Sequence, residues 1–233
     1  MPSGARVLLA SLAVTGVVVG AGLAAVGPDD AAGPGPSGPQ ASPTASATGG
    51  LPGLEDVETR GLAALRAPFC SGVAPAAVAD ALGGEPTRAE SYDNGETAAL
   101  TPKVTDVAHE HGCSWTSAGS GGGSGGAGTT ARAWVFAPPV TAGEARGLAD
   151  DAAAARGCSA VADAPALGDP GVALVCTRGP VRETSYRGLL GDAWLVCSIS
   201  AAGDGPTRAD QLARTSRWCA AVVTAATGST VPD

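Results

Sequence analysis

The sharpest chemical pattern in this 233-residue sequence is a pair of histidines, His109 and His111, separated only by Glu110. Residues two apart on a β-strand point to the same face, so both imidazoles could reach one metal ion. A closed metal site needs a third and a fourth ligand, and the sequence identifies none. A polar pair near a strand end is therefore the favoured interpretation, and we expect no cofactor.

A nucleophilic hydrolase would need a Ser or Cys beside a His base and an orienting acid. Gly122, Ser124 and Gly126 fit the G-x-S-x-G pattern, and Gly121, Gly123 and Gly126 fit G-x-G-x-x-G. Both patterns fall inside a glycine tract that a predicted strand follows, whereas each motif requires a following helix. We interpret them as accidents of composition and assign no catalytic residue.

Four tryptophans, at positions 115, 134, 194 and 218, supply most of the aromatic bulk of an aromatic-poor chain. A role in the core is the favoured interpretation. The alternative is an aromatic-lined ligand pocket between the sheet and its helices, for which Trp115, Trp134 and Trp194 are the candidates.

Six cysteines lie in the part of the chain that can fold, and none form a Cys-x-x-Cys pair, so the spacing of a zinc site is absent. An even number of separated cysteines behind an export segment predicts three disulfides. Six cysteines allow about 15 pairings. We choose the sequential one, which ties helices to strands: Cys70 to Cys113, Cys158 to Cys176, and Cys197 to Cys219.

Residues 7–26 form an uncharged apolar run that follows Arg6, and this run predicts export across a membrane. At a rise of about 1.5 Å per residue, the run would span about 30 Å, which favours an uncleaved anchor. Small residues near its end, at positions 22, 24 and 25, leave cleavage as a signal peptide open. In both cases the rest of the chain lies outside the cytoplasm.

Composition divides the remaining chain into a Pro/Gly/Ser/Ala-rich linker over residues 27–56, one folded domain over 57–227 with a glycine-rich loop at 118–128, and a tail at 228–233. The linker lacks bulky apolar side chains and is predicted to be disordered. The formal charge of -8 argues against binding of nucleic acid. We expect an unknown envelope ligand or protein as partner, and contact with the membrane only through an uncleaved N-terminal segment.

The first half of the domain is predicted to hold helices and one strand pair. Val57, Leu62 and Leu65 recur at helical intervals, and a second short helix follows over 74–82, between Pro75 near its start and the glycines after it. After a polar loop around residues 93–95, alternation over 106–116 and again over 131–136 predicts a hairpin.

The second half repeats this order. Thr141 and Glu144 form a capping box for a helix that reaches about residue 156. Apolar runs at 172–176 and 193–200 predict a second strand pair, and Thr207 begins a closing helix that reaches about residue 224. The order α-ββ-α-ββ-α predicts an α+β fold, with an antiparallel sheet of about four or more strands covered by helices.

Three short motifs carry a family resemblance: FCSGVAPAAVADALGG from Phe69, the C-x-W element Cys113–Trp115, and GLLGDAWLVCSI from Gly188. With them, residues 68–224 resemble secreted or lipid-anchored actinobacterial domains of unknown function. The chain lacks that family's lipid-attachment Cys after the signal and has more cysteines. The resemblance implies ligand binding or sensing at the cell envelope and assigns no catalytic residue. A metal-assisted secreted enzyme using His109 and His111, or a purely structural envelope protein, are the alternatives.

Overall fold

The computed structural model of this protein describes residues 50–101, 104–118, 128–202 and 205–229, all of which belong to the compact unit Ala47–Asp233. The predicted export segment, most of the predicted linker and the centre of the glycine-rich loop lie outside the described residues. Within the described ranges, no helix combines the length and the apolar character that a membrane span requires.

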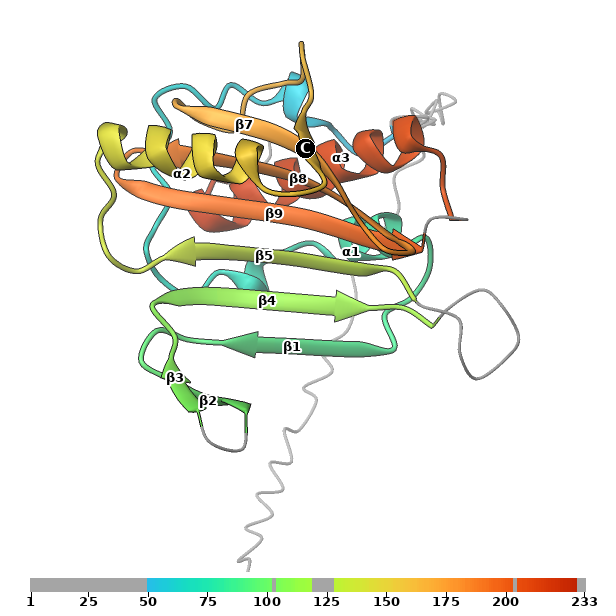
Figure 1. The fold of residues 1–233 in the computed structure, drawn as a ribbon, viewed down its shortest axis with the longest axis horizontal. Helices are drawn as coiled ribbons and strands as arrows, with labels where there is room; N and C mark the ends of the chain where they lie inside the picture. The colour runs from blue at the N-terminus through green and yellow to red at the C-terminus, as the bar shows by residue number, and fades with distance from the viewer. Residues whose placement is uncertain (1–49, 102–103, 119–127, 203–204, 230–233) are drawn as a thin grey trace, which may run out of the picture. The chain divides into compact units, whose positions relative to one another are not determined.

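A seven-stranded antiparallel sheet, in the order β1-β4-β5-β9-β8-β7-β6, organises the domain (Figure 1). A separate two-stranded ribbon, β2–β3, stands beside one end of β1 and β4 (Figure 1). The strands are β1 (Arg88–Tyr92), β2 (Thr97–Thr101), β3 (Val104–Val107), β4 (Glu110–Thr116), β5 (Thr130–Phe136), β6 (Cys158–Ala160), β7 (Gly171–Arg178), β8 (Val181–Leu190) and β9 (Ala193–Ala202).

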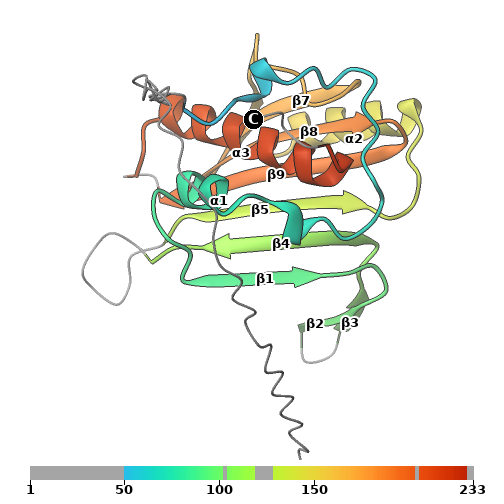
Figure 2. The same ribbon diagram turned by 180° about the vertical axis from the view of Figure 1, so that it is seen from behind.

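Helices cover both faces of the sheet, but unequally. On one face α2 (Ala142–Ala154) packs on β6, β7 and β8 (Figure 1). On the other face lie α1 (Pro75–Leu82), α3 (Arg208–Thr227) and the 3₁₀ turns η1 (Leu54–Asp56) and η2 (Cys70–Gly72) (Figure 2). The predicted α+β class, an antiparallel sheet covered by helices, is confirmed.

The main core fills the space between α3 and the sheet, where Trp218 is fully buried against strand residues such as Leu195 and Ile199. A smaller cluster beneath α2 contains Trp194 and Val196, which face the opposite way. Leu54 belongs to the main core although it falls in the segment predicted as linker. The packed part of the chain thus begins a few residues before Val57.

The helix expected around Val57, Leu62 and Leu65 is wrong, because only η1 forms there and the chain then runs extended. Its backbone groups find partners elsewhere: the amide of Ala64 donates to Leu190 O, and that of Leu65 donates to Ala226 O. This segment therefore makes one turn, in which Leu62 N donates to Thr59 O, and then bonds to the ends of β8 and α3 instead of forming a helix. The short helix after it, α1, begins at Pro75 and ends at Gly83 as predicted.

The strand expected over 106–116 is two strands, β3 and β4, separated at residues 108 and 109. Strands β1 and β2, which occupy the expected polar loop and its flanks, were not predicted. The interruption is fixed by backbone hydrogen bonds from Gly95 N to Ala108 O and from Ala108 N to Glu96 O, which close the base of the ribbon.

The predicted pairing of the runs at 172–176 and 193–200 is also wrong, because β8 lies between β7 and β9 and pairs with both. The sequence of β8, VRETSYRGLL, contains charged and small residues and therefore lacks the apolar run that predicts a strand. The two helices with predicted caps are confirmed: the Thr141 side chain accepts from Glu144 N, and that of Thr207 accepts from Asp210 N.

Three disulfides join the cysteines in the predicted sequential order: Cys70–Cys113, Cys158–Cys176 and Cys197–Cys219. They fasten η2 to β4, β6 to β7 and β9 to α3. Disulfides persist in oxidising compartments, so these links indicate a protein that functions outside the reducing cytoplasm.

Candidate functional site on the open face of the sheet

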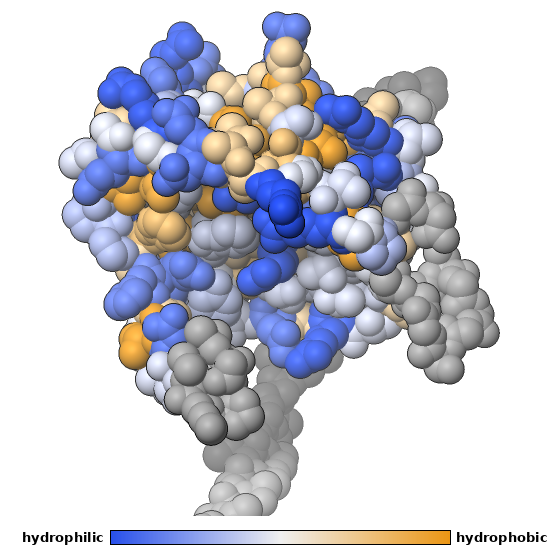
Figure 3. All heavy atoms as spheres, in the orientation of Figure 1, coloured by the Kyte–Doolittle hydropathy of each residue, from blue (hydrophilic) through white to orange (hydrophobic). Residues whose placement is uncertain are grey.

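Strands β1, β4 and β5 carry no helix on the face that α2 partly covers, within the part of the chain that the structure describes (Figure 1). Blue and pale side chains predominate over these strands (Figure 3). An uncovered sheet face that stays folded needs polar or amphipathic side chains, and the register shows which ones this face presents.

One row of side chains runs from the open face to the strands beside and beneath α2. Strand pairing aligns Tyr92 of β1 with Gly112 of β4, Gly112 with Trp134 of β5, Trp134 with Val196 of β9, and Val196 with Arg187 of β8. Gly112 has no side chain, and a Cβ added there would overlap with the ring of Tyr92. The tyrosine ring therefore lies across β4 at this glycine.

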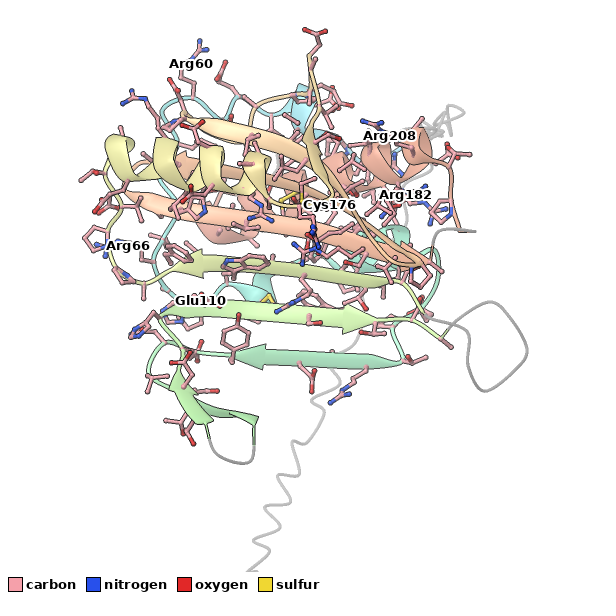
Figure 4. The ribbon with its side chains drawn as sticks, viewed as in Figure 1. Arg60, Arg66, Glu110, Cys176, Arg182 and Arg208 are labelled. Carbon is pink, nitrogen blue, oxygen red and sulfur yellow. A yellow bond between two sulfur atoms is a disulfide. The ribbon has the colours of Figure 1, made fainter. Side chains whose placement is uncertain are left out.

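Tyr92 and Glu110 form the polar centre of the open face. The Tyr92 hydroxyl donates to Glu110 Oε1 at 2.8 Å, and Figure 4 labels Glu110 at the beginning of β4. Burial, together with the hydrogen bond and the negative charge of Glu110, raises the pKa of Tyr92 to about 12. The nearby Arg132 guanidinium acts in the opposite direction. Tyr92 is therefore a neutral donor at physiological pH.

Arg132 connects this centre to the aromatic row. Its guanidinium carbon lies 5.6 Å from the centroid of the Trp134 ring, a cation–π contact. Tyr92, Glu110, Arg132 and Trp134 thus bring two aromatic rings, a carboxylate and a guanidinium together on neighbouring strands of the open face. Planar rings with a few convergent polar groups are typical of small-ligand sites.

A hollow of about 440 Å³ lies between these side chains and the β2–β3 ribbon. We call it the open-face hollow; it is lined by Tyr92, Glu110 and Arg132 from the sheet, by Thr97, Asp106 and Val107 from the ribbon, and by Glu96, Ala108 and His109 at the ribbon's base. Val107 is 41% exposed and adds apolar surface to the wall. This volume is within the range of small-molecule sites.

The two histidines do not share a face of one strand. His109 precedes β4 and lines the open-face hollow, whereas His111 lies in β4 with the parity of Cys113, on the face toward α3. His111 Nδ1 is 3.0 Å from Asp93 Oδ1. The regular strand that the metal hypothesis assumed is interrupted, and no cluster of three or more His, Cys, Asp or Glu suited to a metal occurs among the described residues.

The three candidate tryptophans do not form one pocket. Trp115 packs edge-on against Trp218 at 5.4 Å between ring centroids, on the face of α3. Trp194 is 2% exposed in the cluster beneath α2. Only Trp134 reaches the open face, where Arg132 lies over its ring.

Sequence reasoning missed Tyr92, Glu110, Gly112 and Arg132. Tyr92 stood in a predicted loop, and only the register of β1 against β4 brings it to Gly112. A glycine inside an alternating strand pattern is the one signal that could have indicated a close approach at this point.

Neither protein-family models nor curated protein sequences give a match to this chain. The function must therefore be argued from the geometry of the open face and from the compartment that the disulfides indicate.

Proposed function

We propose that this protein is a non-enzymatic binding or sensing domain of the extracytoplasmic space that holds a ligand of the cell envelope in the open-face hollow. The observation that carries the proposal is the convergence of Tyr92, Glu110 and Arg132 on an uncovered sheet face, beside a wall formed by the β2–β3 ribbon. A rigid sheet positions the three side chains, and the ribbon makes their surface concave.

The location supports an envelope ligand. The three disulfides agree with an oxidising space, and the apolar run at 7–26 predicts export, followed by either secretion or retention as a membrane anchor. The resemblance to actinobacterial extracytoplasmic domains points in the same direction. The Pro/Gly/Ser/Ala-rich segment predicted as a linker over 27–56 would display the domain at a distance from an anchor.

The chemistry of the hollow favours binding over catalysis. All six cysteines are in disulfides, so none supplies a thiol nucleophile. His111 faces away from the hollow toward Asp93, and the Tyr92 hydroxyl is held as a donor to Glu110. These groups suit recognition of a polar ligand on an aromatic surface better than proton transfer to a substrate.

The test is a ligand screen on the full chain, produced by export so that its disulfides form. Thermal shift against peptidoglycan fragments, envelope glycans and lipids should identify a ligand, and isothermal titration should give its affinity. Arg132→Gln removes one charge-assisted hydrogen bond and should weaken binding by about tenfold. Tyr92→Phe should weaken it less, because only the hydroxyl is lost.

Arg208→Gln is the matched control, since Arg208 is exposed at the start of α3, away from the open-face hollow. Its affinity for the ligand should equal that of the unmodified protein. Equal affinity of Arg132→Gln and the unmodified protein would contradict the site, and a screen without any ligand or partner would contradict the function.

A further inference from the structure

A second arginine on the same face, Arg187 of β8, is held in an unusual environment. Its side chain is only 22% exposed, and it ends the row that passes through Trp134 to β8, a strand on which α2 packs. Burial lowers the pKa of Arg187, and the positive charge of Arg178 adds to this effect, while Glu183 acts in the opposite direction. A half-buried guanidinium normally has close partners that replace its water.

The ion pair and the hydrogen bond that Arg187 makes within the protein are weak for a half-buried guanidinium. Its nearest carboxylate oxygen, on Glu183, lies 3.9 Å from the terminal nitrogen, which is too long for a hydrogen bond. Its Nε donates to Ser185 Oγ at 3.4 Å, near the limit of that interaction. Within the described residues, most of the five N–H groups of this guanidinium have no acceptor at short distance.

Hydroxyl groups surround the same spot. Ser185 and Ser198 lie directly opposite each other on β8 and β9, and Arg132 is the partner of Ser198 on the other side. Both serines are buried, at 0% and 2% exposure, on the face of the sheet that holds Arg187. Because they are buried, these hydroxyls are not available to a ligand, which leaves the guanidinium groups as the donors.

The two arginines can reach one ligand. Arg132 and Arg187 are two strands apart and offset by two residues, which corresponds to about 12 Å between their Cα atoms. Arg132 already leans over Trp134, which is aligned through Val196 with Arg187. The two side chains therefore belong to the same face of the sheet, within the span of one ligand.

Charge at this spot is opposite to that of the whole protein. Arg132, Arg178 and Arg187 lie on this face with Glu183 as the carboxylate next to Arg187, while Glu90 and Glu110 lie farther along the same face, in a chain whose formal charge is -8. A partly desolvated cation without a full counter-charge costs free energy, and a bound anion would offset that cost.

We propose that Arg187 and the adjacent Arg132 form an oxyanion site that takes a carboxylate or phosphate group. The inference rests on the proposed function: the body of the ligand occupies the open-face hollow beyond Arg132, and its anionic group reaches Arg187. The envelope ligand is therefore an anionic one. A guanidinium binds both kinds of oxyanion in a bidentate manner.

Inorganic phosphate and acetate are the probes, titrated into the full chain at constant ionic strength with chloride as the reference anion. Isothermal titration should show saturable binding of at least one probe, and the comparison of the two assigns phosphate or carboxylate. Arg187→Gln should weaken that binding by about tenfold, as expected for loss of a charged hydrogen-bond donor. Arg208→Gln, which removes the same charge elsewhere, should leave it unchanged.

Arg187→Lys provides a second variant that preserves charge and bulk if the glutamine variant does not fold. It should also bind the probe more weakly, because an ammonium group cannot form the bidentate contact. Absence of saturable binding by both probes, or unchanged affinity in the folded variants, would overturn the inference.

The outcomes separate this inference from the proposed function. An envelope ligand whose affinity falls in Arg132→Gln but is unchanged in Arg187→Gln would support the proposed function and contradict the anion site. The opposite result is also possible: phosphate or acetate binds and Arg187→Gln weakens it, but the screen finds no envelope ligand. That result would support the anion site and contradict the proposed function.

Discussion

Gly112 makes the arrangement of the open face possible. A glycine inside a strand normally weakens it, since it has no side chain to pack and loses more conformational entropy on folding. Here the ring of Tyr92 fills the place of the missing side chain, and its hydroxyl reaches Glu110 at 2.8 Å. One residue without a side chain thus positions two that carry chemistry.

Gly112→Ala should destabilise the protein by about 1 to 3 kcal/mol, because the added methyl group must displace the Tyr92 ring. In the Tyr92→Ala background the same change should be nearly neutral, since the space is then open. A double-mutant cycle by urea unfolding measures this coupling. Equal costs in the two backgrounds would show that the ring does not lie over Gly112.

The contribution of Tyr92 to the unfolding free energy should also fall in the alkaline pH range. Its pKa is about 12 in the folded protein and near 10.0 in an unfolded chain, so its contribution to stability is complete below pH 10 and is lost as the pH rises toward 12. The difference in unfolding free energy between the unmodified protein and Tyr92→Phe should be constant below pH 10 and should fall above it.

Ultraviolet titration of the folded protein checks the same point, because Tyr92→Phe should remove a tyrosinate signal that develops near pH 12. If Tyr92→Phe instead removes a tyrosinate signal near pH 10, then Tyr92 is neither buried nor hydrogen-bonded to Glu110 in the folded protein. Tyr186 remains in both proteins and cancels in the comparison, although its pKa is also raised by burial.

At the scale of elements, two of the three disulfides fasten elements on the α3 side to the sheet. Cys197–Cys219 joins β9 to α3 through two fully buried residues, and Cys70–Cys113 joins η2 to β4 on the same side of the sheet. The open face opposite therefore rests on a sheet whose covered side is fastened covalently. Rigid support of this kind favours a preformed site.

The unfolding free energy lost on removal of a single disulfide should increase with the length of chain that the disulfide closes. The bond Cys70–Cys113 spans 43 residues and Cys158–Cys176 spans 18, so paired Cys→Ala variants should lose about 4 and about 3 kcal/mol respectively. Urea unfolding of the two variants tests the order. A larger loss for Cys158–Cys176 would show that local packing, and not chain entropy, dominates.

The N-cap of α3 offers a smaller, local test. The Thr207 hydroxyl accepts from Asp210 N at 3.1 Å, and Thr207→Ala should cost about 1 kcal/mol of unfolding free energy. Thr207→Ser retains the hydroxyl and should cost much less. If the two variants are equally stable, the cap does not contribute.

At the scale of the whole molecule, an acidic chain carries three arginines, Arg132, Arg178 and Arg187, on one face of its sheet. The formal charge of -8 disfavours anionic polymers in general, so selective binding of an anion must come from local geometry around Arg187. This contrast distinguishes a specific site from a diffuse attraction, which salt would screen.

The compartment is testable on native material. The mass of the protein purified after export should indicate three disulfides, and no cysteine should react with an alkylating agent before reduction. A reporter fused to the C-terminus should be active only outside the cytoplasm. Alkylatable thiols or a cytoplasmic reporter would contradict the location.

The sequence by itself was sufficient for α1, α2, α3 and the oxidised cysteines. Caps such as Thr141 with Glu144, and Pro75 with Gly83, act within one or two turns, so their signals are local and readable. The sequential pairing of cysteines was a choice among many, which the structure confirmed.

Only the tertiary structure decided the sheet order and the open face. Strand β8 has few β-branched residues and is stabilised by β7 and β9 on its two sides, which no local pattern reveals. The row from Tyr92 through Trp134 to Arg187 depends on the register of five strands that are distant in the chain. Register is a property of strand pairs, and so the site exists only once the sheet has formed.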